Sequence, residues 1–332
     1  MSAKRKGLNI KEGTQIAGRY LVEEQIGEGG FATVYGAKDE IIDRPVAIKV
    51  LELGQIEDDD DKLDRVLQRF LREARTAARI THPSVVDIYD FGVLGDGDAP
   101  YIIMEYLVGV NLYAQINDDG PMSPQWLLPN FCDLLDALGE AHDHQIVHKD
   151  LKPSNVFLNQ PQTRREVWKI VDFGIAHVDG PSSARLTKTG FLSGTPQYLS
   201  PEYIEEQVVS PAMDVYQMGL VLVEALCGEP VVKTRQPFKA VRKHVDGDLD
   251  IDDKIWDSPL GPVLRQALEI DSEKRFRTGH EFADALAGVD PQSVPSYAEP
   301  VRSEQKTAKW VAVDGRESRK TQQFHRDPTK SK

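Results

Sequence analysis

The stretch that decides the fold of this chain runs Ile146-Val147-His148-Lys149-Asp150-Leu151-Lys152-Pro153-Ser154-Asn155. A carboxylate, an amine and an amide, from Asp150, Lys152 and Asn155, fall within six consecutive positions. The segment is polar and contains a proline, which favours a loop, and side chains this close together on a loop can point into one site. We therefore expect a functional site at Asp150, completed by residues elsewhere in the chain.

Two later segments could contribute to that site. Asp172-Phe173-Gly174 begins 22 residues after Asp150 and directly follows a strand-like run over residues 167–171. An isolated Asp-Phe-Gly is most often only a turn. The second segment is Gly194-Thr195-Pro196-Gln197-Tyr198-Leu199-Ser200-Pro201-Glu202.

A glycine-rich segment lies near the start of the chain. It reads Ile26-Gly27-Glu28-Gly29-Gly30-Phe31-Ala32-Thr33-Val34 and joins two predicted strands. Glycine lets a backbone turn and come close to phosphate oxygens, although glycine-rich hairpins without a ligand are common. A dinucleotide fingerprint would need a helix directly after the glycines, and here a strand continues through Tyr35. The Lys and Ser/Thr of a P-loop are also missing from this segment.

The next predicted strand carries one lysine among apolar residues, in Val46-Ala47-Ile48-Lys49. Such a lysine is commonly a surface residue that covers apolar neighbours with its stem. If Lys49 points inward it needs anionic partners, such as phosphate oxygens or a glutamate. Glu73 is the candidate glutamate, on a helical pattern over residues 62–79, although it could equally be an exposed helix charge.

Composition restricts the class of protein. The chain has 332 residues, an apolar fraction of 40% and a net charge of −13, which argues against nucleic acid as the main ligand. Its two cysteines are too few for a disulfide framework, so we expect a reducing, cytoplasmic location. The basic start is followed by no apolar run, and no apolar stretch approaches the roughly 20 residues of a membrane helix. We predict no membrane segment in this chain.

The predicted elements change character along the chain. Short strands and one helix come first, and from about Pro124 the pattern is helical. The predicted strands are 20–26, 33–37, 46–51, 86–92 and 101–106, and the predicted helices are 62–79, 131–144, 213–227, 260–269 and 281–287. This order predicts two lobes with a cleft between them. We divide the chain into a flexible leader (1–13), a first lobe (14–107), a second lobe (108–288) and a disordered polar tail (289–332).

Together and in this order, these segments resemble the eukaryotic-type (Hanks-type) protein kinases, and the bacterial Ser/Thr members in particular. The resemblance extends from about Tyr20 to Leu286. It implies an α+β bilobal fold, with a small β-rich lobe that holds one helix and a larger helical lobe. It also implies transfer of the γ-phosphoryl group of ATP to Ser or Thr hydroxyls of protein substrates, in bacterial signalling.

The resemblance assigns a role to each motif. Asp150 would accept the proton of the substrate hydroxyl, Lys152 would offset charge on the phosphoryl group, and Asn155 and Asp172 would bind Mg²⁺ or Mn²⁺. These residue types suit a reaction that depends on positioning and charge neutralisation. The residues implied to form the ATP site are Gly27, Glu28, Gly29, Gly30, Phe31, Ala32, Val34, Ala47, Lys49, Glu73, Met104, Glu105, Leu107 and Phe157, with Asn111 as a further candidate near the ribose.

Two departures from the family pattern stand out, and the second concerns control of the enzyme. Ala32 replaces a third loop glycine, and Lys149 replaces an arginine that grips phosphate on the activation loop. Lysine keeps the charge but loses the bidentate fork, so control by loop phosphorylation would be weaker. Thr187 and Thr189 are the main candidate sites of autophosphorylation, for which a transient homodimer would serve. Thr195 resembles a residue that braces Asp150.

Two alternatives stay open from the sequence. One is a binding scaffold of the same fold without chemistry, although such proteins usually lose the strand lysine or a catalytic or metal aspartate. The other is a small-molecule phosphotransferase of related fold, which would lack the segment from Gly194 to Glu202, the platform for a substrate peptide that the resemblance to protein kinases implies. The late arginine Arg275 resembles a structural residue expected to pair with Glu202. The chain could be a natural soluble kinase or a cytosolic fragment.

Overall fold

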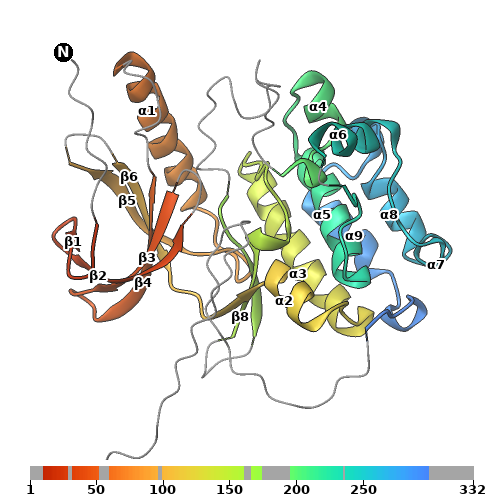
Figure 1. The fold of residues 1–332 in the computed structure, drawn as a ribbon, viewed down its shortest axis with the longest axis horizontal. Helices are drawn as coiled ribbons and strands as arrows, with labels where there is room; N and C mark the ends of the chain where they lie inside the picture. The colour runs from red at the N-terminus through yellow and green to blue at the C-terminus, as the bar shows by residue number, and fades with distance from the viewer. Residues whose placement is uncertain are drawn as a thin grey trace, which may run out of the picture.

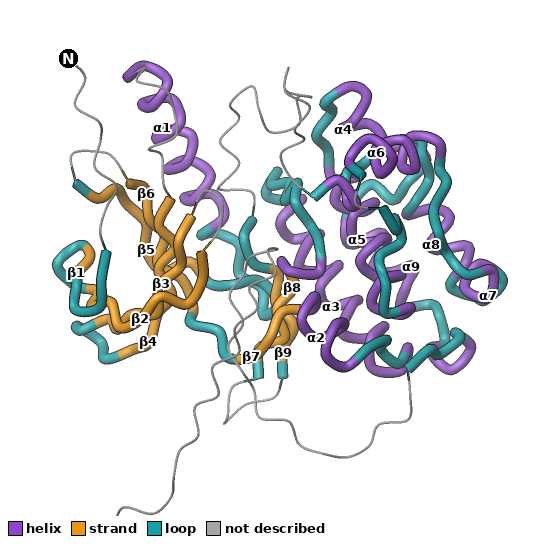
Figure 2. The backbone as a smooth tube through the Cα atoms, viewed as in Figure 1, coloured by secondary structure: helices purple, strands orange, loops and turns teal. Residues whose placement is uncertain are grey.

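Two lobes make up the structure, a computed structural model of the chain (Figure 1). It describes residues 10–28, 32–51, 60–95, 99–160, 166–173, 195–234 and 236–298, with side chains in the first helix described from Asp64 onward. Most strands lie in one lobe and most helices in the other (Figure 2). This arrangement confirms the expected bilobal α+β fold.

The first lobe is built on an antiparallel sheet with the strand order β1-β2-β3-β4-β6-β5. Its strands are β1 (Gln15–Ile16), β2 (Tyr20–Glu28), β3 (Ala32–Asp39), β4 (Arg44–Leu51), β5 (Ile88–Leu94) and β6 (Ala99–Glu105). Successive side chains of a strand point to opposite faces. Val46, Ile48 and Val50 of β4 enter one apolar core, so Ala47 and Lys49 face the other side of the sheet. That alternation aims Lys49 away from this core.

The helix of this lobe is α1 (Asp60–Ala77), which begins and ends two residues before the predicted 62–79. Its buried side chains are Leu67, Phe70, Ala74 and Ala77. These follow the three- and four-residue spacing of one helix face, and Leu67 and Phe70 pack with Leu51 and Ile102 of the sheet. The helix is therefore fastened to the sheet by the amphipathic pattern that the sequence shows.

The second lobe is helical, with a small sheet at its boundary with the first. The sheet has the order β7-β8-β9, and the longest helices are α3 and α5. The elements are β7 (Gly109–Asn111), β8 (Val156–Asn159), β9 (Val167–Ile170), α2 (Leu112–Asp119), α3 (Pro124–Asp143), α4 (Pro201–Glu206), α5 (Pro211–Cys227), α6 (Pro237–Asp246), α7 (Asp253–Trp256), α8 (Gly261–Ala267) and α9 (Gly279–Ala287), with the 3₁₀ turns η2 (Pro153–Asn155), η3 (Pro196–Tyr198), η4 (Ser272–Lys274) and η5 (Pro291–Ser293).

Helix α5 forms the centre of this lobe. Every residue from Ala212 to Leu226 is buried, which agrees with the all-round apolar pattern of the predicted helix 213–227. Its polar exceptions, Asp214, Gln217 and Glu224, are buried as well. Buried polar groups need hydrogen-bond partners, so these three side chains mark the points where α5 holds other segments.

An ion pair inside the second lobe confirms one sequence expectation. Arg275 donates to both carboxylate oxygens of Glu202, at 2.9 Å each, and its side chain is fully buried. The same guanidinium donates to the carbonyls of Ala212, Glu269 and Ile270. The pair thus connects α4, the start of α5 and the segment before η4.

The described residues correct the predicted limits of the leader and the tail. Ile10 packs against the first-lobe core, so the expected loose leader does not extend to residue 13. At the other end, Val289 and Val294 are buried in the second-lobe core, and η5 contacts α3. The start of the predicted tail is thus packed against the second lobe through these two apolar residues, despite their polar surroundings. The remaining tail lies outside the described residues. In the described parts of the chain, no helix combines the length and the apolar character needed to cross a bilayer.

Candidate active site

The predicted catalytic loop folds back on itself around Asp150. The Lys152 ammonium lies 2.8 Å from Asp150 Oδ2. Asn155, at the end of η2, donates from Nδ2 to the Asp150 carbonyl at 2.7 Å and to its Oδ2 at 3.3 Å. The loop therefore presents one carboxylate, partly exposed, between a cation and an amide.

Helix α5 holds this loop from below through Asp214. The buried Asp214 carboxylate accepts from the backbone N–H of His148 at 2.7 Å and from that of Lys149 at 2.8 Å. Lys149 has φ 72°, a left-handed conformation that side chains disfavour. Such a conformation persists only where the surroundings impose it, and the two bonds to Asp214 do so here.

His148 connects the loop to the Asp-Phe-Gly segment. Its Nδ1 accepts from the Asp150 N–H, so Nε2 carries the proton and donates to the Val171 carbonyl at 2.9 Å. The ring lies 5.0 Å from the ring of Phe173. These contacts place Asp172, between Val171 and Phe173, at the same site as Asp150.

Asp172 is ionised in this site. Burial works against the ionised form, but Lys49 Nζ at 2.7 Å from Oδ1, with His148 and Lys152 nearby, holds the pKa of Asp172 below its ordinary value. Lys49 therefore points inward to an anionic partner and is not the exposed surface lysine that the sequence also allowed. Its charge and that of Lys152 act on the same carboxylate, which makes the site a cluster of two acids and two cations.

The expected pairing of Lys49 with Glu73 is not formed. Among the described residues Lys49 pairs with Asp172, whereas Glu73 Oε1 accepts from Arg69 Nε at 2.8 Å, one turn earlier on α1. Glu73 and Arg69 are both about a quarter exposed. A partner four residues away on the same helix is always within reach, so Arg69 competes with Lys49 for Glu73.

An apolar cavity adjoins the charged cluster. It is lined by Leu51, Phe70, Met104 and Phe173, with Lys49 and Asp172 at its polar side. Met104 lies opposite Ala47 in the β4–β6 register. A mixed lining of this kind, apolar walls with few polar groups, is typical of a small-molecule site.

The predicted adenine-binding residues lie at the connection between the lobes. Leu107 and Phe157 pack together with Val86 and Val171 in one small core, against which Met104 packs. The Glu105 N–H donates to the Asp87 carbonyl at 2.9 Å, so this N–H is not free for a ligand. The Glu105 side chain pairs instead with the buried Lys169, at 2.8 Å.

The remaining predicted site residues lie in several parts of the structure, and some lie outside the residues that it describes. Gly27, Glu28, Ala32 and Val34 are paired in the β2–β3 and β3–β4 ladders, whereas Gly29, Gly30, Phe31, Thr187 and Thr189 lie outside the described residues. Asn111 is buried and its side chain caps α2 by accepting from the Ala114 N–H, which corrects its suggested place near a ribose. Thr195 directly precedes η3, and among the described residues no hydrogen bond joins its side chain to Asp150.

Two polar contacts of the segment from Thr195 to Glu202 were not predicted. The Tyr198 hydroxyl donates to the buried Glu224 carboxylate at 2.7 Å. Gln217 contacts both this segment and the catalytic loop. The only sequence signal for either was a polar residue inside an otherwise apolar helix.

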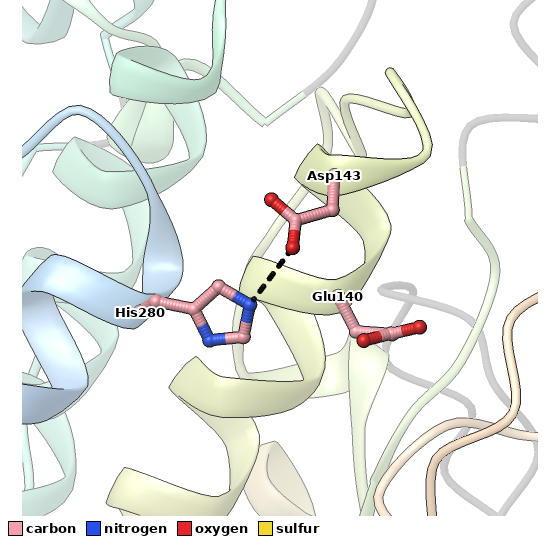
Figure 3. Close-up of side chains that lie close together, drawn as sticks. All are labelled: Glu140, Asp143 and His280. Carbon is pink, nitrogen blue, oxygen red and sulfur yellow. Dashed lines mark ion pairs between the residues drawn. The ribbon is translucent and has the colours of Figure 1, made fainter.

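A second group of side chains of metal-ligand type, Glu140, Asp143 and His280, lies away from this site, where α9 meets α3 (Figure 3). His280 Nδ1 lies 2.8 Å from Asp136 Oδ1, and its Nε2 lies 3.5 Å from Asp143 Oδ2. Glu140 lies near Asp143 and His280, but its carboxylate points away from the histidine ring (Figure 3). The contacts of His280 with these two carboxylates join α9 to α3.

Comparison with known proteins agrees with this geometry. The chain is 33% identical over 307 residues to the serine/threonine-protein kinase PknB of Mycolicibacterium smegmatis, covering 90% of this chain and 47% of the relative. It is 32% identical over 307 residues to PrkC of Bacillus subtilis, covering 91% and 45%. The crystal structure of the Mycobacterium tuberculosis PknI kinase domain superposes with a TM-score of 0.62 at 26% identity, covering 84% of this chain and 98% of that domain. The chain thus spans about half the length of these curated relatives.

A two-lobed fold with this paired-acid, paired-cation site defines a phosphotransferase of the protein kinase class. The sequence matches the protein kinase domain family over residues 20–301, and the chain belongs to that family. Membership implies the use of ATP and of a divalent metal ion in general.

Proposed function

We propose that this chain transfers the γ-phosphoryl group of ATP to Ser and Thr hydroxyls of proteins. The observation that supports this most strongly is the Asp150 carboxylate, held between Lys152 and Asn155 in the same site as Asp172 and Lys49. The relatives named serine/threonine-protein kinases support the choice of hydroxyl. Signalling in a bacterium is the role that these relatives suggest.

In this proposal Asp150 orients the substrate hydroxyl and takes its proton. The hydroxyl oxygen forms a bond to the γ-phosphorus while the bond from that phosphorus to the bridging oxygen breaks, and ADP leaves with the electron pair. The proton moves to an Asp150 carboxylate oxygen. Lys152, 2.8 Å from the same carboxylate, is close enough to offset charge on the transferred group.

Asn155 and Asp172 are the proposed metal ligands. The Asn155 amide nitrogen donates to Asp150, which leaves the amide oxygen for a cation. A carboxylate and an amide oxygen are the donors that Mg²⁺ prefers, and Mn²⁺ accepts the same set. Bound there, the ion would supply positive charge to the phosphate oxygens. Lys49, already paired with Asp172, would add its own charge to those oxygens.

The adenine ring is proposed to occupy the connection between the lobes. Val34 and Ala47 would cover one ring face and Phe157 the other, with Met104 at the rear. The Leu107 backbone and the Glu105 carbonyl are the proposed hydrogen-bonding groups. The glycine segment from Gly27 to Ala32 would cover the phosphates.

Regulation by autophosphorylation of Thr187 and Thr189, within a transient homodimer, stays a proposal from the sequence. Its test is mass spectrometry of the wild type and of Asp150→Asn, both produced in the same host. Phosphate on either threonine in the wild type and not in the variant is expected. Equal occupancy in both proteins would contradict it.

We further propose that the lobes meet near residue 107 and that the chain is loose at its two ends. The composition supports both proposals, and the packing of Ile10, Val289 and Val294 shortens the ends. A cytoplasmic location rests on the cysteine content.

The proposed activity is tested with γ-labelled ATP, Mg²⁺ and a generic protein substrate such as casein, followed by phosphoamino-acid analysis. Label is expected on Ser and Thr. Asp133→Asn is the matched control, because Asp133 is an exposed carboxylate on α3 with no place in the site. Label on tyrosine alone, or none with either Mg²⁺ or Mn²⁺, would contradict the proposal.

A further inference from the structure

Gln217 is an amide buried within the apolar helix α5, with 1% of its surface exposed. It lies three residues after Asp214, so both side chains leave the same face of the helix. That face supports the catalytic loop, because Asp214 holds the N–H groups of His148 and Lys149. A buried amide on this face needs partners of its own.

Its partners are three backbone groups from two segments. Gln217 Oε1 accepts from the Leu151 N–H at 3.0 Å, and Nε2 donates to the Lys149 carbonyl at 3.2 Å and to the Tyr198 carbonyl at 3.1 Å. The neighbours fix the orientation of the amide, since an N–H requires its oxygen and two carbonyls require its nitrogen. Both amide hydrogens and the oxygen are thus used.

Two of these bonds enclose Asp150. Lys149 and Leu151 are its neighbours in the chain, so Gln217 fixes the backbone on both sides of the proposed catalytic carboxylate. The backbone of Lys149 has a disfavoured φ of 72°, and it is held by Asp214 at its N–H and by Gln217 at its carbonyl. Without Gln217, only the bonds of Asp214 would hold this backbone from α5.

The third bond reaches a different segment. Tyr198 ends η3, within the stretch from Gly194 to Glu202 that is expected to receive the substrate peptide. Its side chain is held separately by Glu224 of α5. Through Gln217, the backbone of this segment and the backbone of the Asp150 loop share one donor group.

We propose that Gln217 is a positioning residue for phosphotransfer, holding the backbone around Asp150 and tying it to the segment that receives the protein substrate. This inference rests on the proposed kinase function. It assigns Gln217 no contact with ATP or with the reacting atoms. Its loss should therefore reduce turnover and leave nucleotide affinity in place.

The test compares Gln217→Met with Val221→Ala in the full chain. Methionine keeps the length and apolar volume and removes all three bonds. Val221 lies one turn further along α5, is fully buried in the core, and has no part in the site, so its truncation reports loss of packing alone. Gln217→Asn, which keeps the amide but shortens its reach, serves if the methionine variant does not fold.

The first readout is hydrogen exchange of the protein without nucleotide or substrate. A peptide that contains Leu151 should exchange roughly tenfold faster in Gln217→Met than in the wild type, because its N–H loses an acceptor. Val221→Ala should leave the exchange rate of that peptide unchanged. Unchanged exchange in Gln217→Met would overturn the inference.

The second readout is steady-state kinetics well below the melting temperature of each variant. For Gln217→Met we expect a fall in kcat of roughly 10- to 100-fold, the scale of a catalytic group displaced by about 1 Å, with the KM for ATP nearly unchanged. Equal losses of kcat in Gln217→Met and Val221→Ala would overturn it. A wild type without phosphotransfer, but with the exchange difference present, would refute the proposed function and leave the backbone contacts standing.

Discussion

The buried pair between Arg275 and Glu202 leads to a quantitative prediction about stability. The Arg275 side chain is fully buried, and the side chain of Glu202 is 9% exposed. In Arg275→Met the methionine fills much of the space, but Glu202 loses its counter-ion and three backbone carbonyls lose a donor. Removing one partner of a buried ion pair costs about 3–5 kcal/mol, against a total stability of about 5–15 kcal/mol for an ordinary domain.

Urea denaturation followed by circular dichroism measures this loss. We expect Arg275→Met to lower the free energy of unfolding by about 3–5 kcal/mol, and Arg265→Met, an exposed arginine on α8, by less than about 1 kcal/mol. The double variant with Glu202→Gln should lose less than the sum of the two single variants, because the stranded charge is then removed. Additive losses, or a loss in Arg275→Met as small as that in Arg265→Met, would refute the reasoning.

Three further predictions concern α1, α5 and α3. Arg69→Met should raise kcat/KM about twofold, because an ion pair worth about 0.3–0.5 kcal/mol no longer holds Glu73 away from the strand lysine; an unchanged or lower value would contradict the competition. Burial raises the pKa of Glu224 to about 7, against a hydrogen bond that lowers it, so wild-type stability should fall as pH rises from about 4.5 to 7. Relative to wild type, Glu224→Gln should gain about 2–3 kcal/mol over that range in urea titrations, and a pH-independent difference would oppose this assignment. Gly139→Ala should cost about 1–3 kcal/mol in the same assay, since the added methyl would lie 2.4 Å from the His280 ring, and a neutral effect would show that α9 can shift freely.

The sequence was most informative where periodicity and short motifs coincide. Alternation along β4 predicts that Lys49 and Val50 face opposite sides of the sheet. The apolar residues on all sides of α5 predict a helix at the centre of its lobe. The shared site of Asp150 and Asp172 was predicted from the resemblance to protein kinases, which depends on the order of the motifs. Strand alternation, by contrast, is a local rule that tertiary packing rarely overrides.

Choices between competing partners could not be predicted. Glu73 has one candidate partner in Lys49 of the sheet and another in Arg69 on its own helix, and a pair within a helix is worth only about 0.3–0.5 kcal/mol. Asn111 caps helix α2, which begins at the next residue, and the sequence pattern of residues 112–119 did not reveal that helix. Likewise, Val294 is buried although it lies in a polar stretch, since burial there depends on the distant helix α3.

The measurement that bears most directly on the central claim is single-turnover phosphotransfer by Asp150→Asn. With nucleotide affinity measured in parallel by a fluorescent ATP analogue, the variant should bind as the wild type does and transfer phosphate at least about 100-fold more slowly, the scale of a lost general base. Asp133→Asn should match the wild type in both. Transfer by Asp150→Asn at a rate close to that of the wild type would contradict the assignment of Asp150 as the proton acceptor.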